Sequence, residues 1–382
     1  MSAPRVFLDS GGSAPVSPRT LQALQAGLAE GWADPARLHA ESRRARALVD
    51  GAREAIADAL GANAGHVHFT TSAVLGLERV IAGVWSARRG REDVVVSAIE
   101  RDAVVHAAAH VAGRPPLELP VDRLGHVDLD ALTAALDSPA VALAAIQHAN
   151  HELGTVQNLD AVHAVTRGRD VPLVVDATSS IGHVEAPAAW DALVANPADW
   201  GAPAGIGVVA LRPGTRWLPS WPEGDDWAPG GTSVPLALAA AVALQERLER
   251  GEEESARLSA LIAKARAHMA QIPGVDVVGD PDQRLPHVLT FSCLYVDGEA
   301  LLTRLDRQGF AVGSGSACTT SSLEPSRVLG AIGALTHGNV RLALHPGITE
   351  ANIDAFLAAV TTEIARLRGE AGAPALERVG ND

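Results

Sequence analysis

The chain has two thiols, and one of them lies in a segment typical of an exposed reactive loop. Cys318 is surrounded by small and hydroxylated residues in VGSGSACTTSSLEPSRVL, residues 312–329. Such a composition leaves backbone amides free and a thiol accessible, which favours a nucleophile or a persulfide carrier. Cys293 lies in the apolar run LTFSCLYV and is typical of a packed core thiol. Two cysteines cannot form a disulfide framework or a cysteine-rich zinc site, so Cys318 is the candidate for sulfur chemistry.

The supply of side-chain amines is equally restricted. Of the 31 basic residues, 30 are arginine, and the single lysine is Lys264. This lysine falls within Glu252–Ala270, where apolar residues recur at helical spacing. A lysine on the polar face of an amphipathic helix is solvated, so we expect Lys264 to be a surface residue and not a catalytic amine.

Histidine spacing assigns no metal site. His106 and His110 lie four residues apart within 104–111, a segment with a helical pattern, and would share one face of that helix. A zinc site needs at least three protein ligands, and no third candidate lies near them in sequence. We therefore expect these two histidines to be structural and name no metal ligand from the sequence.

Composition excludes several classes of protein among the 382 residues. Hydrophobic residues make up 47% of the chain and charged residues 20%, enough for a large buried core. The net charge is −14 and the arginines form no stripe, which argues against a nucleic-acid partner. We find no uncharged apolar stretch of about 18 residues and no secretory signal core. A protein without membrane spans, located in the cytoplasm, is the expectation.

Short apolar runs alternate with longer helical patterns, and this alternation predicts α/β layers with a mostly parallel sheet. The expected strands are His66–Thr71, Asp93–Ala98, Val141–Gln147, Pro172–Asp176, Gly205–Leu211 and His287–Cys293. The expected helices are Leu38–Leu60, Val74–Ala87, Leu129–Leu136, Ala161–Arg167, Pro235–Arg250, Glu252–Ala270 and about Thr349 to Arg368. We divide the chain into a large domain, residues 16–245, and a smaller α/β domain formed by residues 1–15 and 246–382.

The motifs of the chain, taken in order, resemble those of cysteine desulfurases with the shorter active-site loop. The matching segments are FLDSGGSAP, the region from Pro35 to Arg53, HFTTSAVLGLE, NHELGTVQN, VVDATSSIG, GIGVVAL, NVRLAL and SGSACTTSSLEPSRVL. Each segment is weakly specific alone, but eight in order cover nearly the whole chain. The family is class V aminotransferase-like with the fold type I architecture of pyridoxal-phosphate (PLP) enzymes. The resemblance implies a seven-stranded, mostly parallel sheet and a smaller C-terminal α/β domain.

The resemblance also implies roles for individual residues, some of which the chain retains. Asp176 matches the carboxylate that keeps the pyridine nitrogen of PLP protonated. Cys318 matches the sulfur carrier, and Arg341 matches the arginine that binds the substrate carboxylate. Thr232 matches a phosphate-contacting threonine supplied by the dimer partner. The family therefore implies a homodimer or a dimer with a related desulfurase, together with a sulfur-acceptor protein.

Other positions depart from the family pattern. The lysine that holds PLP as a Schiff base aligns with Asp199, whose carboxylate cannot form an imine. The histidine that stacks on the ring aligns with Arg101, a ring-contacting asparagine with His151, and the glutamine near the ring oxygen with Ser179. In the phosphate turn, Val74 replaces a threonine.

Three interpretations follow from these departures. In the first, the protein is desulfurase-like, has lost PLP-dependent catalysis, binds no cofactor, and acts in sulfur transfer or as a scaffold through the Cys318 loop. In the second, Arg101, His151, Asp176 and Asp199 gather in the old pocket and perform new chemistry without PLP, such as acid–base catalysis or metal binding. In the third, the protein is a genuine cysteine desulfurase that uses PLP non-covalently.

Overall fold

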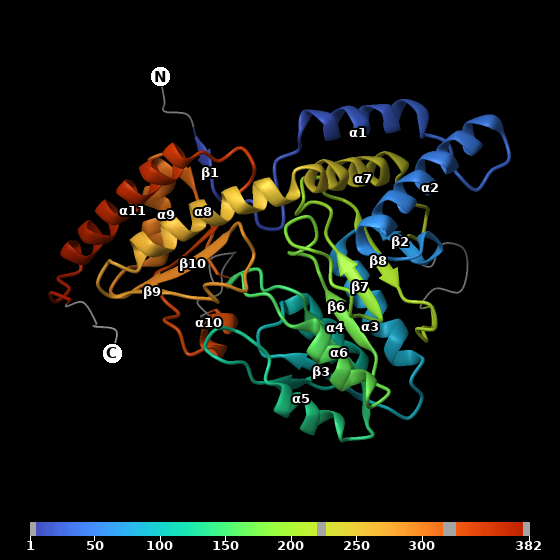
Figure 1. The fold of residues 1–382 in the computed structure, drawn as a ribbon, viewed down its shortest axis with the longest axis horizontal. Coiled ribbons are helices and arrows are strands. Elements are labelled where there is room, and N and C mark those ends of the chain that lie inside the picture. The colour runs from blue at the N-terminus through green and yellow to red at the C-terminus, as the bar shows by residue number, and fades with distance from the viewer. Residues whose placement is uncertain (1–4, 220–226, 316–325, 377–382) are drawn as a thin grey trace.

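The computed structural model describes residues 5–219, 227–315 and 326–376. Figure 1 shows two lobes, one built around a large twisted sheet and one around a smaller sheet flanked by the C-terminal helices. Each lobe has a hydrophobic core of its own. Within the described ranges, no helix combines the length and the apolar character needed to cross a bilayer.

A seven-stranded sheet forms the centre of the larger lobe, in the order β2-β8-β7-β6-β5-β3-β4. All neighbours are parallel except β2–β8 and β7–β8, which are antiparallel. The expected α/β class with a mostly parallel seven-stranded sheet is confirmed. The strands are β2 (Val67–Thr70), β3 (Asp93–Ser97), β4 (Leu117–Leu119), β5 (Val141–Gln147), β6 (Leu173–Asp176), β7 (Ala192–Ala195) and β8 (Gly207–Leu211).

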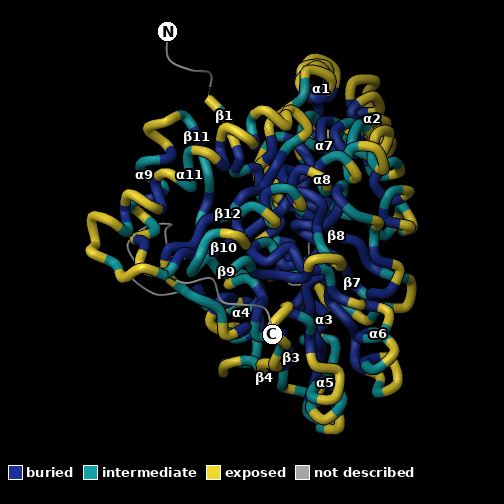
Figure 2. Tube along the Cα trace, turned by 60° about the vertical axis from the view of Figure 1, so that its left-hand side comes forward, coloured by how far each residue is buried: buried dark blue, intermediate teal, exposed yellow. Residues whose placement is uncertain are grey.

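Helices cover both faces of this sheet, because alternate residues of each central strand point to opposite sides. Val175 belongs to the core under one set of helices, α2 (Ala40–Leu60), α5 (Leu129–Leu136), α6 (Leu159–Arg167) and α7 (Val234–Glu249). Its neighbour Val174 packs under α3 (Ala73–Ser86) and α4 (Asp102–Ala112) on the other face. The central strands are thus buried on both sides, as Figure 2 shows in dark blue.

The smaller lobe contains an antiparallel sheet in the order β12-β10-β9, with a helical layer packed against it. Its strands are β9 (Val275–Val277), β10 (Val288–Cys293) and β12 (Asn339–Ala343), and its helices are α8 (Gly251–Met269), α9 (Gly298–Arg307), α10 (Arg327–Ala331) and α11 (Glu350–Glu370). The N-terminal strand β1 (Val6–Phe7) pairs with β11 (Phe310–Ala311) of this lobe. The division into domains 16–245 and 1–15 with 246–382 stays a proposal.

Helix α1 (Pro18–Glu30) packs on α7 at the outer edge of the larger lobe. Ser17 caps its N-terminus and proline follows at the first helical position, a favourable helix start. Most of its residues remain exposed. The exposed apolar residues on and after this helix include Leu28, Trp32 and Leu38.

Candidate functional site

Asp176 lies at the carboxyl end of β6, the edge at which parallel α/β sheets bind their ligands. The side chain is 4% exposed. Its Oδ1 accepts hydrogen bonds from the Thr178 backbone amide at 2.9 Å and from the Thr178 hydroxyl at 2.6 Å. The turn that follows the strand thus fixes this carboxylate from one side.

Arg101 supplies the positive charge that faces Asp176. It stands at the N-cap of α4, and its Nε lies 3.7 Å from Asp176 Oδ2. Its Nη1 donates to the Thr178 hydroxyl at 2.8 Å, and that hydroxyl in turn donates to Asp176. Arginine and aspartate are therefore joined both directly and through one threonine, so the buried carboxylate is charge-compensated by the chain itself.

Glu100, the residue before Arg101, is a second acidic group under the site. Its Oε1 accepts from Ser97 Oγ at 2.5 Å and from the Gln147 amide at 2.9 Å. Burial raises the pKa of Glu100 to about 8, and the nearby Asp176 charge acts in the same direction. At neutral pH this carboxyl group is therefore largely protonated, and it adds little negative charge to the site.

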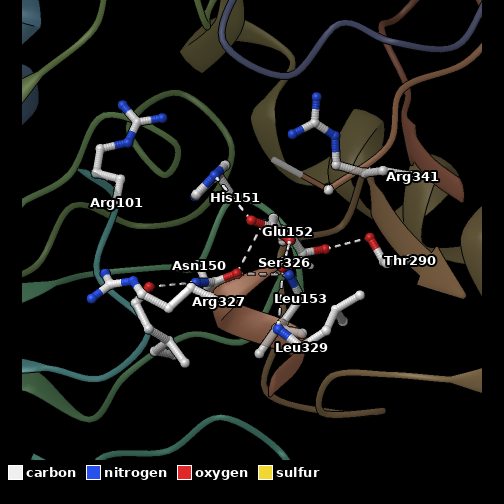
Figure 3. A network of polar contacts seen from close by, with 12 residues as sticks. Arg101, Asn150, His151, Glu152, Leu153, Thr290, Ser326, Arg327, Leu329 and Arg341 are labelled. Carbon is white, nitrogen blue, oxygen red and sulfur yellow. Dashed lines mark hydrogen bonds and ion pairs between the residues drawn. The ribbon is translucent and has the colours of Figure 1, made fainter. Parts of the chain in front are cut away.

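The half-buried His151 and the buried Glu152 form a polar network beside Arg341 and Arg101, shown in Figure 3. Ser326 donates to Glu152 Oε2 at 2.7 Å, and His151 Nε2 lies 3.7 Å from Glu152 Oε1. The pKa of His151 lies well below its usual value because of burial and, secondarily, the charges of Arg101 and Arg341. A neutral imidazole therefore stands where the resemblance places a ring-contacting asparagine.

Asp199 lies in a turn soon after β7, and the chain around it holds its carboxylate in place. Its Oδ1 accepts from the Gly12 amide at 2.5 Å, and its Oδ2 lies 3.0 Å from His183 Nε2. The residue is 2% exposed. The contacts of Asp199 are therefore separate from those of the Arg101–Asp176 pair. Asp176 and Asp199 do not share one charge network.

His183 and His287 extend the contacts of Asp199, and sequence reasoning missed both. Their rings are stacked, with centroids 3.7 Å apart and an interplanar angle of 17°. The pKa of His287 is well below its usual value because of burial, followed by the charges of His183, Arg247 and Arg341. His183 follows β6 and His287 precedes β10, so no local spacing in the sequence links the two.

The remaining candidate residues lie around these groups. Arg341, on β12, donates from Nη2 to Asp9 Oδ1 at 2.9 Å. Ser179 is buried beyond β6, and Thr232 is half-buried before α7. Ser72 caps α3, whose N-terminus the resemblance aligns with the family's phosphate turn. Cys318 lies outside the described residues.

Lys264 lies on α8 and is engaged with acidic side chains of the same lobe. Its ammonium nitrogen is 2.8 Å from Glu350 Oε1 and also pairs with Asp354. The side chain is 38% exposed. Its expected surface position is thus confirmed.

The chain was compared with protein families, with individual proteins and with solved structures. Residues 6–356 match the family model of class-V aminotransferases. The chain is 30% identical to the cysteine desulfurase IscS of Dictyoglomus turgidum over 95% of both chains. It is also 30% identical to the cysteine desulfurase NifS of Azotobacter vinelandii, over 95% of this chain and 93% of that one. Among solved structures, a NifS-like protein superposes with a TM-score of 0.87 at 23% identity, covering 95% and 100% of the two chains.

These matches correct the expectation that no cofactor is bound. Cysteine desulfurases and NifS-like proteins are PLP-dependent, so a cofactor is expected for this chain and the prediction of none was wrong. The residues fit it in part. Asp176 would face the ring nitrogen, and the α3 N-terminus would receive the phosphate. The residue that the resemblance aligns with the covalent attachment does not fit, because Asp199 carries a carboxylate, which cannot form an imine.

Proposed function

Because the chain belongs to the class-V aminotransferase family, we propose that it is a cysteine desulfurase-like protein acting in sulfur transfer without lysine-dependent desulfuration. The relatives named above are cysteine desulfurases, which supports a role in sulfur transfer. Asp199, anchored by Gly12 and His183, supports the loss of the amine-dependent step. That step needs an amine to hold the cofactor aldehyde and to move the substrate's α-proton.

No second lysine is present to take over this step. Lys264 is the one lysine of the sequence, and it is occupied by Glu350 and Asp354 on the helical layer of the smaller lobe. The buried carboxylate of Asp199 carries the opposite charge to the missing ammonium. The buried Asp199 carboxylate, aligned with the family lysine, is the single observation that carries the proposal.

We assign the retained sulfur function to Cys318, with Arg341 binding the carboxylate of a cysteine-like group. The sequence around Cys318 supports a carrier role. Cys293, the other thiol, is 1% exposed, and burial raises its pKa to about 12, so it is inert as a nucleophile at neutral pH. A sulfur-acceptor protein in the cytoplasm is the proposed partner.

We further propose that the protein is a dimer, with a second copy or with a related desulfurase. The apolar side chains of Leu28, Trp32 and Leu38 are 60%, 70% and 84% exposed, a costly arrangement for a monomer. The family pocket is completed across a two-fold interface, and Thr232 would then contribute to the partner's pocket.

The test is sulfur transfer between purified proteins. An active desulfurase is loaded with radiolabelled cysteine sulfur, separated from free cysteine and mixed with this protein. We expect label on Cys318, which peptide mass spectrometry locates, and none in Cys318→Ser. With the donor demonstrably loaded, absence of label from the wild-type chain would remove the carrier role and leave a scaffold role.

A genuine desulfurase that holds PLP without a covalent link is the second candidate. It is favoured by Asp176, which keeps its place at the sheet edge with its carboxylate fixed by Thr178. The two candidates differ in one product, because only the second forms alanine from cysteine.

A further inference from the structure

Three side chains of types that can bind a metal ion converge between the two lobes. His183 comes from the turn beyond β6, Asp199 from the turn beyond β7, and His287 from the residue before β10. One potential ligand atom from each lies within 4.8 Å of those from the other two. The residues are 6%, 2% and 1% exposed, so water competes little with any ligand they bind.

Two atoms of this cluster lack the hydrogen bonds that buried polar atoms normally make. Asp199 Oδ2 and His287 Nδ1 are both inaccessible and have no hydrogen-bond partner among the residues that the structure describes. Asp199 Oδ2 is within ion-pair distance of His183 Nε2, at 3.0 Å, but not in hydrogen-bond geometry. Buried polar atoms in folded proteins are normally hydrogen-bonded, so two unpaired atoms in one cluster indicate a missing partner.

The chemistry of the donors selects the kind of partner. Two imidazoles and one carboxylate are the ligand set of catalytic zinc sites, whereas Mg²⁺ and Ca²⁺ prefer oxygen ligands. Bonds of about 2.0–2.2 Å place tetrahedral ligand atoms roughly 3.4 Å apart, so a separation of 4.8 Å must close by about 1.4 Å on binding. The stacked rings of His183 and His287 must also turn apart, because the lone pair of an imidazole nitrogen lies in the plane of its ring. Arg247 and Arg341, whose charges act on His287, oppose the ion and limit its affinity.

We propose that His183, Asp199 and His287 bind one divalent transition-metal ion, with Zn²⁺ the best match. Three protein ligands leave a fourth coordination position open for water or a small anion. Asp199 thereby acquires a role of its own at the position of the family lysine. This proposal does not depend on whether Cys318 carries sulfur, and it requires no PLP.

The test uses the full chain without a polyhistidine tag, stripped with a chelator and then titrated with Zn²⁺ alone against a chromophoric competitor. We expect one tightly bound Zn²⁺ per chain. Co²⁺ in the same site should give intense visible bands typical of four- or five-coordination. A stoichiometry well below one, or only the weak spectrum of octahedral Co²⁺, would overturn the proposal without any variant.

Matched variants locate the site. His183→Gln, Asp199→Asn and His287→Gln should each weaken Zn²⁺ binding by more than about tenfold, since even loss of an outer-shell partner costs 10–100-fold. His148→Gln is the control, because His148 is also a buried histidine but contacts Ser180 and lies outside the cluster. Equal Zn²⁺ affinity in the cluster variants and the control would contradict the proposal. Circular dichroism verifies folding, and the Co²⁺ spectrum of the wild-type chain decides if a variant unfolds.

Discussion

Asp199 Oδ2 lies 3.0 Å from His183 Nε2, with both side chains at most 3% exposed. The resemblance aligns Asp199 of this pair with the lysine that binds PLP in the related desulfurases. An exposed aspartate at that position would be a simple loss of function. Here the Gly12 amide also donates a hydrogen bond to the carboxylate, and the ring of His287 stacks on that of His183. Several contacts therefore hold this carboxylate in one position. We therefore infer that specific contacts hold Asp199 in place and that its presence is more than the loss of a lysine.

The Arg101–Asp176 pair should contribute measurably to stability. Arg101→Ala removes the cation and the hydrogen bond that Arg101 donates to the Thr178 hydroxyl, which leaves the Asp176 carboxylate buried with fewer partners. We expect the free energy of unfolding to fall by about 1–3 kcal/mol, measured by urea denaturation.

Arg19→Ala is the matched control for this experiment. Arg19 also pairs with an acidic residue, Glu249, but the two side chains are 48% and 54% exposed. Its loss should change stability much less than the loss of Arg101, because water screens an exposed ion pair. Equal small effects in both variants would show that water, and not Arg101, compensates Asp176.

Glu100 should make stability depend on pH. Burial raises its pKa to about 8 in the folded protein, whereas an unfolded chain has a pKa of about 4.3. The folded state therefore binds more protons between these values, and the contribution of Glu100 to stability is lost as pH rises from about 4.5 through 8. Glu100→Gln keeps the acceptor for Ser97 and Gln147 and should flatten this decline. Denaturant melts at pH 5 and 8 compare the two, and identical pH slopes would contradict the assignment.

The exposed apolar residues after α1 should mediate dimer formation. Trp32→Asp, which places a charge at a 70% exposed tryptophan, should convert the dimer to a monomer of 39.5 kDa in light scattering. Tyr295→Asp changes a 49% exposed aromatic residue on the other lobe and should leave the mass unchanged. A wild-type monomer at micromolar concentration would rule out the homodimer.

The two thiols should differ sharply in reactivity. Cys293 is buried in β10 with its pKa raised to about 12, so it should resist alkylation in the native protein and react after unfolding. Cys318 is expected from its sequence to react under native conditions. Mass spectrometry of iodoacetamide-treated protein distinguishes them. Modification of Cys293 before Cys318 would be the opposite of this expectation.

Much of the fold was predictable because its local signals agree with its tertiary packing. The expected strand Val141–Gln147 and the expected helix Leu129–Leu136 have the bounds of β5 and α5. Strand β7 was not predicted, since its short sequence ALVA carries little β signal and is fixed by burial between β6 and β8. Helix α1 was also missed, although Ser17 and Pro18 form a recognisable helix start.

The site was predictable only where one segment carries the signal. Asp176 was identified through the resemblance of VVDATSSIG to a family motif, and Arg101, which was also identified by alignment, lies beside it in the structure. The partnership of Asp199 with His183 and His287 was not predictable, because it joins three distant segments from two lobes. Chain spacing contains no information on such a cluster, which depends on how the lobes pack.

Formation of alanine from L-cysteine tests the central claim most directly. The purified protein is incubated with cysteine, a thiol reductant and saturating PLP, with PLP alone as the blank and an active cysteine desulfurase as the positive control. We expect no alanine above the blank, because Asp199 cannot supply the amine on which the step depends. Alanine that forms over many turnovers, saturates with cysteine and scales with protein concentration would contradict the account and establish a genuine desulfurase.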